Sequence, residues 1–240
     1  MRKQRIPMAV TIRLVIIAVL MLALIVSTNR PAFSMTIDVL AWATTRDTTS
    51  VTQDRQKVTA LHEAGHLVVS AALRGMGSIH SAKVFTRVAT DSDNTLYGES
   101  DTDVSIPQGS RSDAMNVAAV FYAGMMTESA LLDRDSDSSG SDQKAASAAI
   151  FDRFENPETA EHGMAALQTD SELKSFMKDS TAAAACATAT VYANAQVIRD
   201  LGDEIMRQPT YFNRRHMSED ELREFFTSHP ITKASPACDF

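Results

Sequence analysis

Apolar residues recur three and four positions apart along most of the chain, and this spacing predicts a mainly α-helical protein. The predicted helices cover residues 52–73, 112–132, 143–154 and much of 157–226. Ser50 or Thr52 can cap the first helix, and Gly75 follows its end. Ser218 and Glu221 form a capping box ahead of the last helix.

A short extended region separates the first two helices. Residues 79–88 and 96–99 read as strands, with a polar turn at 91–94 between them. The sequence therefore predicts a small β-hairpin or sheet within the helical domain. An exposed strand edge can hold a peptide by main-chain hydrogen bonds, and the strand near 79–88 is the one expected to hold the substrate. A small sheet that only packs on the core is the alternative, and both interpretations stay open at this point.

The N-terminus combines basic and apolar residues in the order typical of membrane targeting. Arg2, Lys3, Arg5 and Arg13 precede an uninterrupted apolar run at 14–26. An N-terminal transmembrane helix over residues 6–26, with Arg13 snorkelling to the surface, is the favoured interpretation. The alternative is a secretory signal cleaved near Ala32-Phe33-Ser34, after which the protein is exported. In either case, the rest of the chain is expected on the non-cytoplasmic side.

The expected domain organisation follows from these segments. The boundaries are an anchor or signal at 1–34, a linker at 35–51, a folded domain at 52–228 and a loose tail at 229–240. The formal charge of -7 gives no electrostatic reason to expect nucleic acid. Cys186 and Cys238 are the only cysteines, and the sequence leaves open whether they pair.

The first helix carries His62-Glu63-Ala64-Gly65-His66, an H-E-x-x-H motif. Residues four apart lie on one face of a helix, so His62 and His66 can direct ring nitrogens to a common point. Two imidazoles in this arrangement suit Zn²⁺, and Glu63 can accept a proton from a zinc-bound water. The motif therefore predicts His62 and His66 as zinc ligands and Glu63 as the catalytic base.

A catalytic zinc ion requires a third protein ligand. The metzincin arrangement is excluded because Val69 and Ala72 stand where it needs glycine and histidine. The remaining candidates are Asp142, where a polar loop enters a helix, and Glu128, inside an apolar helix. A short, rigid side chain at Asp142 can reach across to a neighbouring helix. Glu128 is expected to accept a hydrogen bond from a ligand histidine, or to be the alternative ligand.

Three stretches resemble the peptidase domain of the FtsH-type, membrane-bound, ATP-dependent zinc proteases. Residues 58–66 look like the start of that domain, 123–131 are similar to its G-R-A-A-E-E stretch, and 139–142 fall where its T-G-A-x-x-D ligand lies. The resemblance implies a helical peptidase domain with a small β element. It also implies zinc on His62, His66 and Asp142, with Glu63 as base.

The sequence contains no counterpart of the family's ATPase module, and no phosphate-binding loop. We therefore expect a membrane-anchored zinc metalloendopeptidase that hydrolyses unfolded or flexible polypeptides. A separate ATPase or a homo-oligomer stays open as a partner. The alternative hypotheses are a non-catalytic, zinc-containing module that binds peptides or a partner, and a helical scaffold without metal.

Overall fold

The computed structural model describes residues 48–89, 96–105, 110–133, 140–152, 169–232 and 236–240. The described helices are α3 (Gln53–Arg74), α4 (Arg111–Leu132), α5 (Gly140–Asp152), α7 (Asp170–Ala193), α8 (Ala195–Arg207) and α9 (Glu219–Ser228). The described strands are β1 (Thr48–Ser50), β2 (Ile79–Phe85), β3 (Arg87–Ala89), β4 (Gly98–Thr102) and β5 (Arg214–Met217). The expected mainly helical fold with small sheets is confirmed for these residues.

All described residues except Thr48 and Ala89 belong to one compact unit, and α3 runs through its interior. The side chain of Thr52 caps α3 by accepting a hydrogen bond from the Arg55 backbone. Gly75 ends the helix with a φ of 85°, which glycine adopts without strain. Every residue from 62 to 71 is buried, so this part of α3 is covered on all sides.

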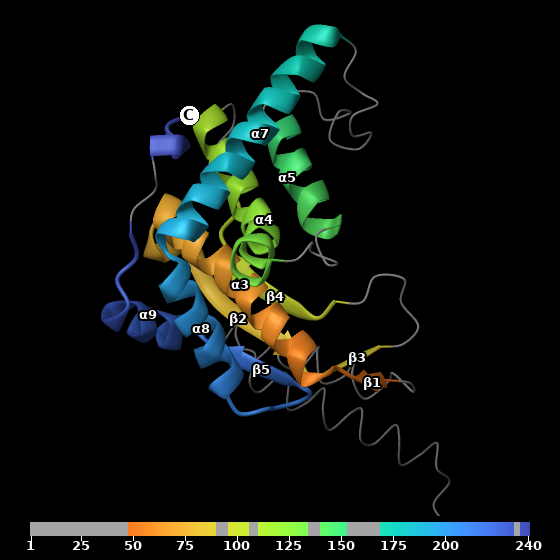
Figure 1. The fold of residues 1–240 in the computed structure, drawn as a ribbon, viewed down its shortest axis with the longest axis vertical. Coiled ribbons are helices and arrows are strands. Elements are labelled where there is room, and N and C mark those ends of the chain that lie inside the picture. The colour runs from red at the N-terminus through yellow and green to blue at the C-terminus, as the bar shows by residue number, and fades with distance from the viewer. Residues whose placement is uncertain (1–47, 90–95, 106–109, 134–139, 153–168, 233–235) are drawn as a thin grey trace, which may run out of the picture. The chain divides into compact units, whose positions relative to one another are not determined.

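A three-stranded antiparallel sheet lies along α3 (Figure 1), in the strand order β4-β2-β5. Ala82 of β2 is opposite Ser100 of β4 on one side and opposite Met217 of β5 on the other. β2 is therefore the central strand, and β4 is an edge strand. β1 and β3 pair separately in a two-stranded sheet.

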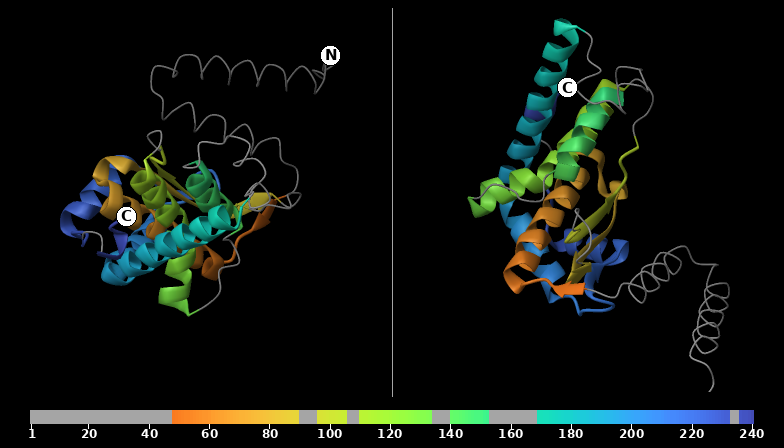
Figure 2. Two further views of the ribbon diagram at one scale, coloured as in Figure 1. Left: turned by 90° about the horizontal axis from the view of Figure 1, so that it is seen from above. Right: turned by 90° about the vertical axis from the view of Figure 1, so that its right-hand side faces the viewer.

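Helix α4 packs against α3 on one side and against α5 and α7 on the other (Figure 2). Two apolar clusters fill the spaces between these elements. The first includes Leu67 of α3, Leu201 of α8 and Leu222 of α9. The second includes Met115 of α4 and Ile150 of α5. Because α4 contributes to both clusters, it joins the two parts of the core.

The C-terminal residues are fixed to α7, which corrects the expectation of a loose tail. The sequence left open whether the two cysteines pair. In the structure, Cys186 on α7 and Cys238 form a disulfide bond. Cys238 belongs to the short 3-10 helix η3 (Pro236–Cys238). Asn194 also exchanges two hydrogen bonds with the backbone of Thr232, at 2.7 and 3.1 Å.

Two other sequence expectations need correction. The extended region at 79–88 is divided into β2 and β3, and the strand expected at 96–99 lies at Gly98–Thr102. Residues 214–217, expected to be helical, form β5, because pairing with β2 outweighs local preference.

The expected N-terminal anchor at 1–34 and most of the linker lie outside the described residues, as do the turn at 91–94 and residues 157–168. The last residues of the expected linker form β1. Within the described part of the chain, no helix has both the length and the apolar character that crossing a bilayer requires.

Candidate metal centre

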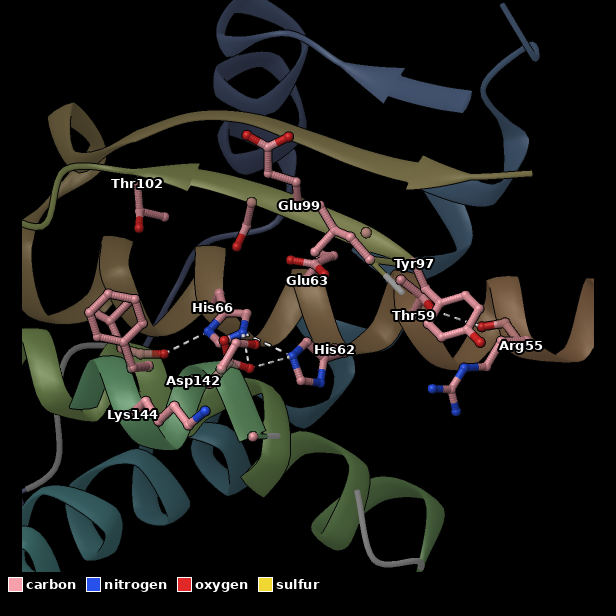
Figure 3. A pocket seen from close by; sticks show the side chains of 17 residues that line it. Arg55, Thr59, His62, Glu63, His66, Tyr97, Glu99, Thr102, Asp142 and Lys144 are labelled. Carbon is pink, nitrogen blue, oxygen red and sulfur yellow. Dashed lines mark hydrogen bonds and ion pairs between the residues drawn. The ribbon is translucent and has the colours of Figure 1, made fainter. Parts of the chain in front are cut away.

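Helix α3 presents His62 and His66 to the same point, as their four-residue spacing predicts. The two Nε2 atoms are 3.0 Å apart, and each histidine side chain is only 7% exposed. Figure 3 shows both rings directed toward Asp142. Both histidines are thus withdrawn from solvent with their Nε2 atoms facing one another.

The opposite nitrogen of each ring has its own acceptor. His62 donates its Nδ1 proton to Oε1 of Glu128, at 2.7 Å. His66 donates its Nδ1 proton to the backbone carbonyl of Val120, also at 2.7 Å. These bonds fix the ring orientations and leave both Nε2 atoms available as ligands. Glu128 therefore lies behind His62, in the supporting position favoured from the sequence.

Asp142 completes the cluster from a different helix. It lies in the first turn of α5, and its Oδ2 is 3.0 Å from Nε2 of His62 and 3.5 Å from Nε2 of His66. The structure thus brings together two residues of α3 and a carboxylate 80 positions after His62 in the chain. Asp142 was the third ligand that the sequence analysis expected.

The spacing of these atoms fits one metal ion. Three ligands that share a tetrahedral zinc ion at roughly 2.0–2.2 Å lie about 3.3–3.5 Å from one another. The separations of 3.0, 3.0 and 3.5 Å are close to this range. His62, His66 and Asp142 form the group that could hold a metal ion among the described residues. Two neutral imidazoles and a carboxylate are a suitable donor set for zinc.

Gly124 of α4 permits this convergence. A Cβ atom at position 124 would overlap with Nε2 of His62 and with Nε2 of His66. Any other residue would therefore occupy the space where the ligand atoms meet. Gly65 of α3 has a matching role, because a Cβ there would collide with the Thr127 side chain of α4. The two glycines allow α3 and α4 to approach closely beside the site.

Two carboxylates beside His62 favour its protonated form. Burial is the largest influence on the pKa of His62 and lowers it, but hydrogen bonds to Asp142 and Glu128 outweigh burial and raise the pKa to about 10. Burial also acts to raise the pKa of Asp142, yet the two histidines hold it well below its ordinary range. Protonated His62 thus supplies next to Asp142 the positive charge that a bound cation would otherwise supply.

Glu63 lies beside the cluster, on the side of the sheet (Figure 3). It is 6% exposed, and burial raises the pKa of its carboxyl group. Electrostatic interactions with His62 and His66 and a hydrogen bond with Ser100 partly oppose this effect. Gly98 of β4 lies so close that a Cβ there would meet Oε1 of Glu63. Glu63 is therefore held between α3 and β4 without joining the three candidate ligands.

The cluster and Glu63 line a cleft of about 1030 Å³. β4 forms one wall, and Asp142 and Lys144 of α5 lie on the opposite side (Figure 3). Arg55 is positioned at one end, with its guanidinium 4.4 Å from the centre of the Tyr97 ring. The cleft therefore combines a candidate metal centre, a buried carboxylate and an adjacent strand.

Sequence reasoning missed three parts of this site. They are the Val120 carbonyl, the glycine at 124 beneath the rings and the glycine at 98 over Glu63. The glycine inside an otherwise apolar helix was a visible signal for the second of these, because glycine in a helix interior disfavours the helix. No local pattern marked the other two.

Comparisons with known proteins do not assign the chain to a family. No family model matches it, and a search of curated proteins found no matching relative.

Proposed function

We propose that the protein is a zinc metalloendopeptidase. The observation that carries the proposal is the convergence of His62, His66 and Asp142, with each histidine held through its Nδ1 atom. This is the ligand number of a catalytic zinc site, which keeps one coordination position for water or substrate. The buried Glu63 beside it provides the general base that the H-E-x-x-H motif requires.

The residues around the cleft divide the chemistry between them. Zinc, when bound, supplies a Lewis acid that polarises the scissile carbonyl and lowers the pKa of water. Glu63 accepts the proton of the attacking water and delivers it to the leaving amine nitrogen. The raised pKa of Glu63 supports this exchange, because a carboxyl group that binds its proton more readily is a better base. Glu128 and Val120 keep the two imidazoles oriented.

The strand that we propose as the substrate-binding strand is β4, which differs from the strand expected from the sequence. The stretch near 79–88 was expected to do so, but β2 is hydrogen-bonded to strands on both sides. β4 is an edge strand of the described sheet, and its residues Gly98, Glu99 and Ser100 line the cleft. We therefore propose that an extended polypeptide pairs with β4. Only an unfolded or flexible segment can adopt this conformation, which sets the substrate class.

The proposed location is the non-cytoplasmic side of a membrane, with the chain anchored by its N-terminal segment. The basic residues ahead of the apolar run at 14–26 support this orientation. The Cys186–Cys238 bond gives independent support, because disulfides persist mainly in oxidising compartments. Export after cleavage at the Ala32-Phe33-Ser34 site is compatible with the same disulfide and is the alternative.

A relationship to the FtsH-type peptidases is part of the proposal. It is supported by the order of the three similar stretches and by the meeting of His62, His66 and Asp142 in one cluster. A separate ATPase or a homo-oligomer would be needed for folded substrates, because an edge strand accepts only extended chains.

Hydrolysis of casein by the purified full chain tests the proposal. We expect wild-type protein to degrade casein, a chelator to stop the reaction, and added Zn²⁺ to restore it. Glu63→Gln should reduce hydrolysis by at least roughly 100-fold, because the proton acceptor is lost. Zinc content should be unchanged in this variant. Glu224→Gln is the matched control and should leave hydrolysis unchanged, since Glu224 is exposed on α9 and does not line the cleft.

Two results would contradict the proposal. A Glu63→Gln protein as active as wild type would exclude Glu63 as the base. Bound zinc without any turnover would favour the alternative of a non-catalytic module that binds peptides or a partner.

A further inference from the structure

A tight two-residue turn connects α8 to β5 and displays two aromatic side chains. Tyr211 and Arg214 exchange both backbone hydrogen bonds, at 2.9 and 3.0 Å. Phe212 and Asn213 lie between them with φ values of 47° and 63°. Two consecutive left-handed residues are typical of a type I′ turn, which favours asparagine and glycine. We call Tyr211 and Phe212 the aromatic tip.

Phe212 is unfavourable at this position for two reasons. A bulky residue with positive φ is a conformational outlier, which is retained only where something else compensates for it. Phe212 is also 51% exposed and Tyr211 is 63% exposed, so neither ring gains much from burial in the domain. A strained backbone that holds two exposed aromatic rings makes the turn a candidate contact surface.

Basic residues surround the aromatic tip. The Thr86 backbone donates a hydrogen bond to the Asn213 carbonyl at 2.7 Å, and the exposed Arg87 is the next residue after Thr86. Arg215 is on β5, directly after the turn, and Arg207 ends α8 with its side chain 67% exposed. Aromatic rings with arginines around them suit the headgroup region of a bilayer with anionic lipids.

The same end of the domain receives the chain from the N-terminal segment. The Val51 backbone donates a hydrogen bond to the Thr86 carbonyl at 2.9 Å, so Thr86 links the start of the domain to the turn. Residues 27–47 separate the apolar run at 14–26 from the described domain. Even fully extended, 21 residues reach at most about 70 Å. An anchored N-terminal segment would therefore hold the domain within about 70 Å of the bilayer.

We propose that the aromatic tip inserts into the headgroup region of an anionic phospholipid bilayer, next to the arginines that contact lipid phosphates. A protein partner fits less well, because a stable protein interface needs about 800 Å² on each side and two side chains at one turn supply much less. The inference rests on the membrane anchoring in the proposed function. It does not depend on the peptidase activity.

Tryptophan fluorescence of the full chain in vesicles tests this contact. Trp42 is the only tryptophan, so Trp42→Phe provides a background without it. Phe212→Trp then reports on the tip. Tyr192→Trp is the matched control, because Tyr192 is 62% exposed at the end of α7. Helix α8 separates the two positions by about 20 Å.

We expect the tryptophan at 212 to emit at shorter wavelength in vesicles with anionic lipid than in detergent-free buffer or in neutral vesicles. Lipids brominated on their acyl chains should quench it at least about twofold more than the tryptophan at 192, because interfacial aromatic rings reach the acyl boundary. Replacing Arg87 and Arg207 with glutamine should reduce the quenching difference between the two positions.

Three results would overturn the inference. The first is equal quenching of the tryptophans at 212 and 192, and the second is failure of the full chain to bind the vesicles. The third is a shorter-wavelength emission at 212 without lipid quenching, which would indicate contact with protein. Casein hydrolysis by the same samples reports separately on the proposed function, since neither tip residue lines the cleft.

Discussion

At the scale of single residues, Gly124 sets how closely α4 can approach the two histidines of α3. The glycine has no side chain at the point where both Nε2 atoms face α4, and a Cβ atom there would overlap with both. The positions of the ligand atoms therefore depend on the absence of a side chain at Gly124 as well as on the residues that bind the metal. The same reasoning identifies a substitution that should affect the metal without removing a ligand.

We predict that Gly124→Ala weakens zinc binding by at least roughly tenfold, because the new methyl group forces the two imidazoles apart. Substitutions of residues that orient metal ligands reduce metal affinity by a similar factor. Competition with a fluorescent chelator measures the affinity. Gly77→Ala is the control, because a Cβ at position 77 has no neighbour within 4 Å. Equal zinc affinity in the two variants would show that the approach of α4 does not shape the site.

Zinc binding should depend on pH through His62. Its raised pKa of about 10 means that the metal-free site holds a proton at neutral pH, and zinc must displace it. In the metal-free protein, this proton stabilises the fold fully below pH 6.5, and the contribution is lost as pH rises toward 10. Apparent zinc affinity should change in the opposite direction, rising about tenfold per pH unit between pH 6 and 8 for one displaced proton.

Calorimetric titrations in buffers of different ionisation enthalpy count the displaced protons. We expect at least one proton released per zinc. No release, or an affinity that is constant from pH 6 to 8, would show that His62 binds no proton at this position.

At the scale of helices and strands, the helices followed from the sequence more closely than the strands. α3 and α4 lie within a residue or two of their expected bounds, because both carry long runs of helically spaced apolar residues and clear caps. β5 was missed because Arg214-Arg215-His216-Met217 has no alternating pattern, and its conformation depends on pairing with a strand about 130 residues earlier.

The parts of the candidate site also differ in how far the sequence could predict them. The spacing within α3 was sufficient to predict that His62 and His66 share a target. Asp142 was selected with the help of a family resemblance, because its contact with His62 spans 80 positions. The contact between His66 and the Val120 carbonyl spans 54 positions and involves only a backbone atom on the α4 side, so no residue type could reveal it.

The capping box of α9 should stabilise that helix and the cluster it covers. Ser218 and Glu221 each bond to the other's backbone, and Leu222 is fully buried. We predict that Ser218→Ala lowers the free energy of unfolding by about 1 kcal/mol. Thr227→Ala, in the exposed last turn of α9, should change it by less than about 0.5 kcal/mol. Urea unfolding distinguishes these outcomes, and equal values for both variants would remove the role of the cap.

At the scale of the whole molecule, the Cys186–Cys238 bond closes the chain across α7, α8, β5 and α9. It joins the last residues of the chain to the cluster formed by α4, α5 and α7. Because α4 also supplies Gly124 and Glu128, this cluster supports one side of the candidate metal centre. The bond therefore contributes to the stability of the part of the domain on which the site depends.

Replacing both cysteines with alanine should lower the free energy of unfolding by about 2–4 kcal/mol, since the bond closes a loop of 52 residues. Denaturation of the wild type in the presence of a strong reductant should give a similar loss, and the double variant should be insensitive to the reductant. Stability that is the same with and without the cysteines would show that the bond does not constrain the unfolded chain.

The account depends most directly on one metal ion bound by His62, His66 and Asp142. Zinc per chain, measured by elemental analysis of the purified full chain after exhaustive dialysis, tests this for the wild type and for Asp142→Asn. We predict about one zinc per wild-type chain and a small fraction of that in the variant, because a third protein ligand is lost. A wild-type protein without zinc, or a variant with as much zinc as the wild type, would contradict the account.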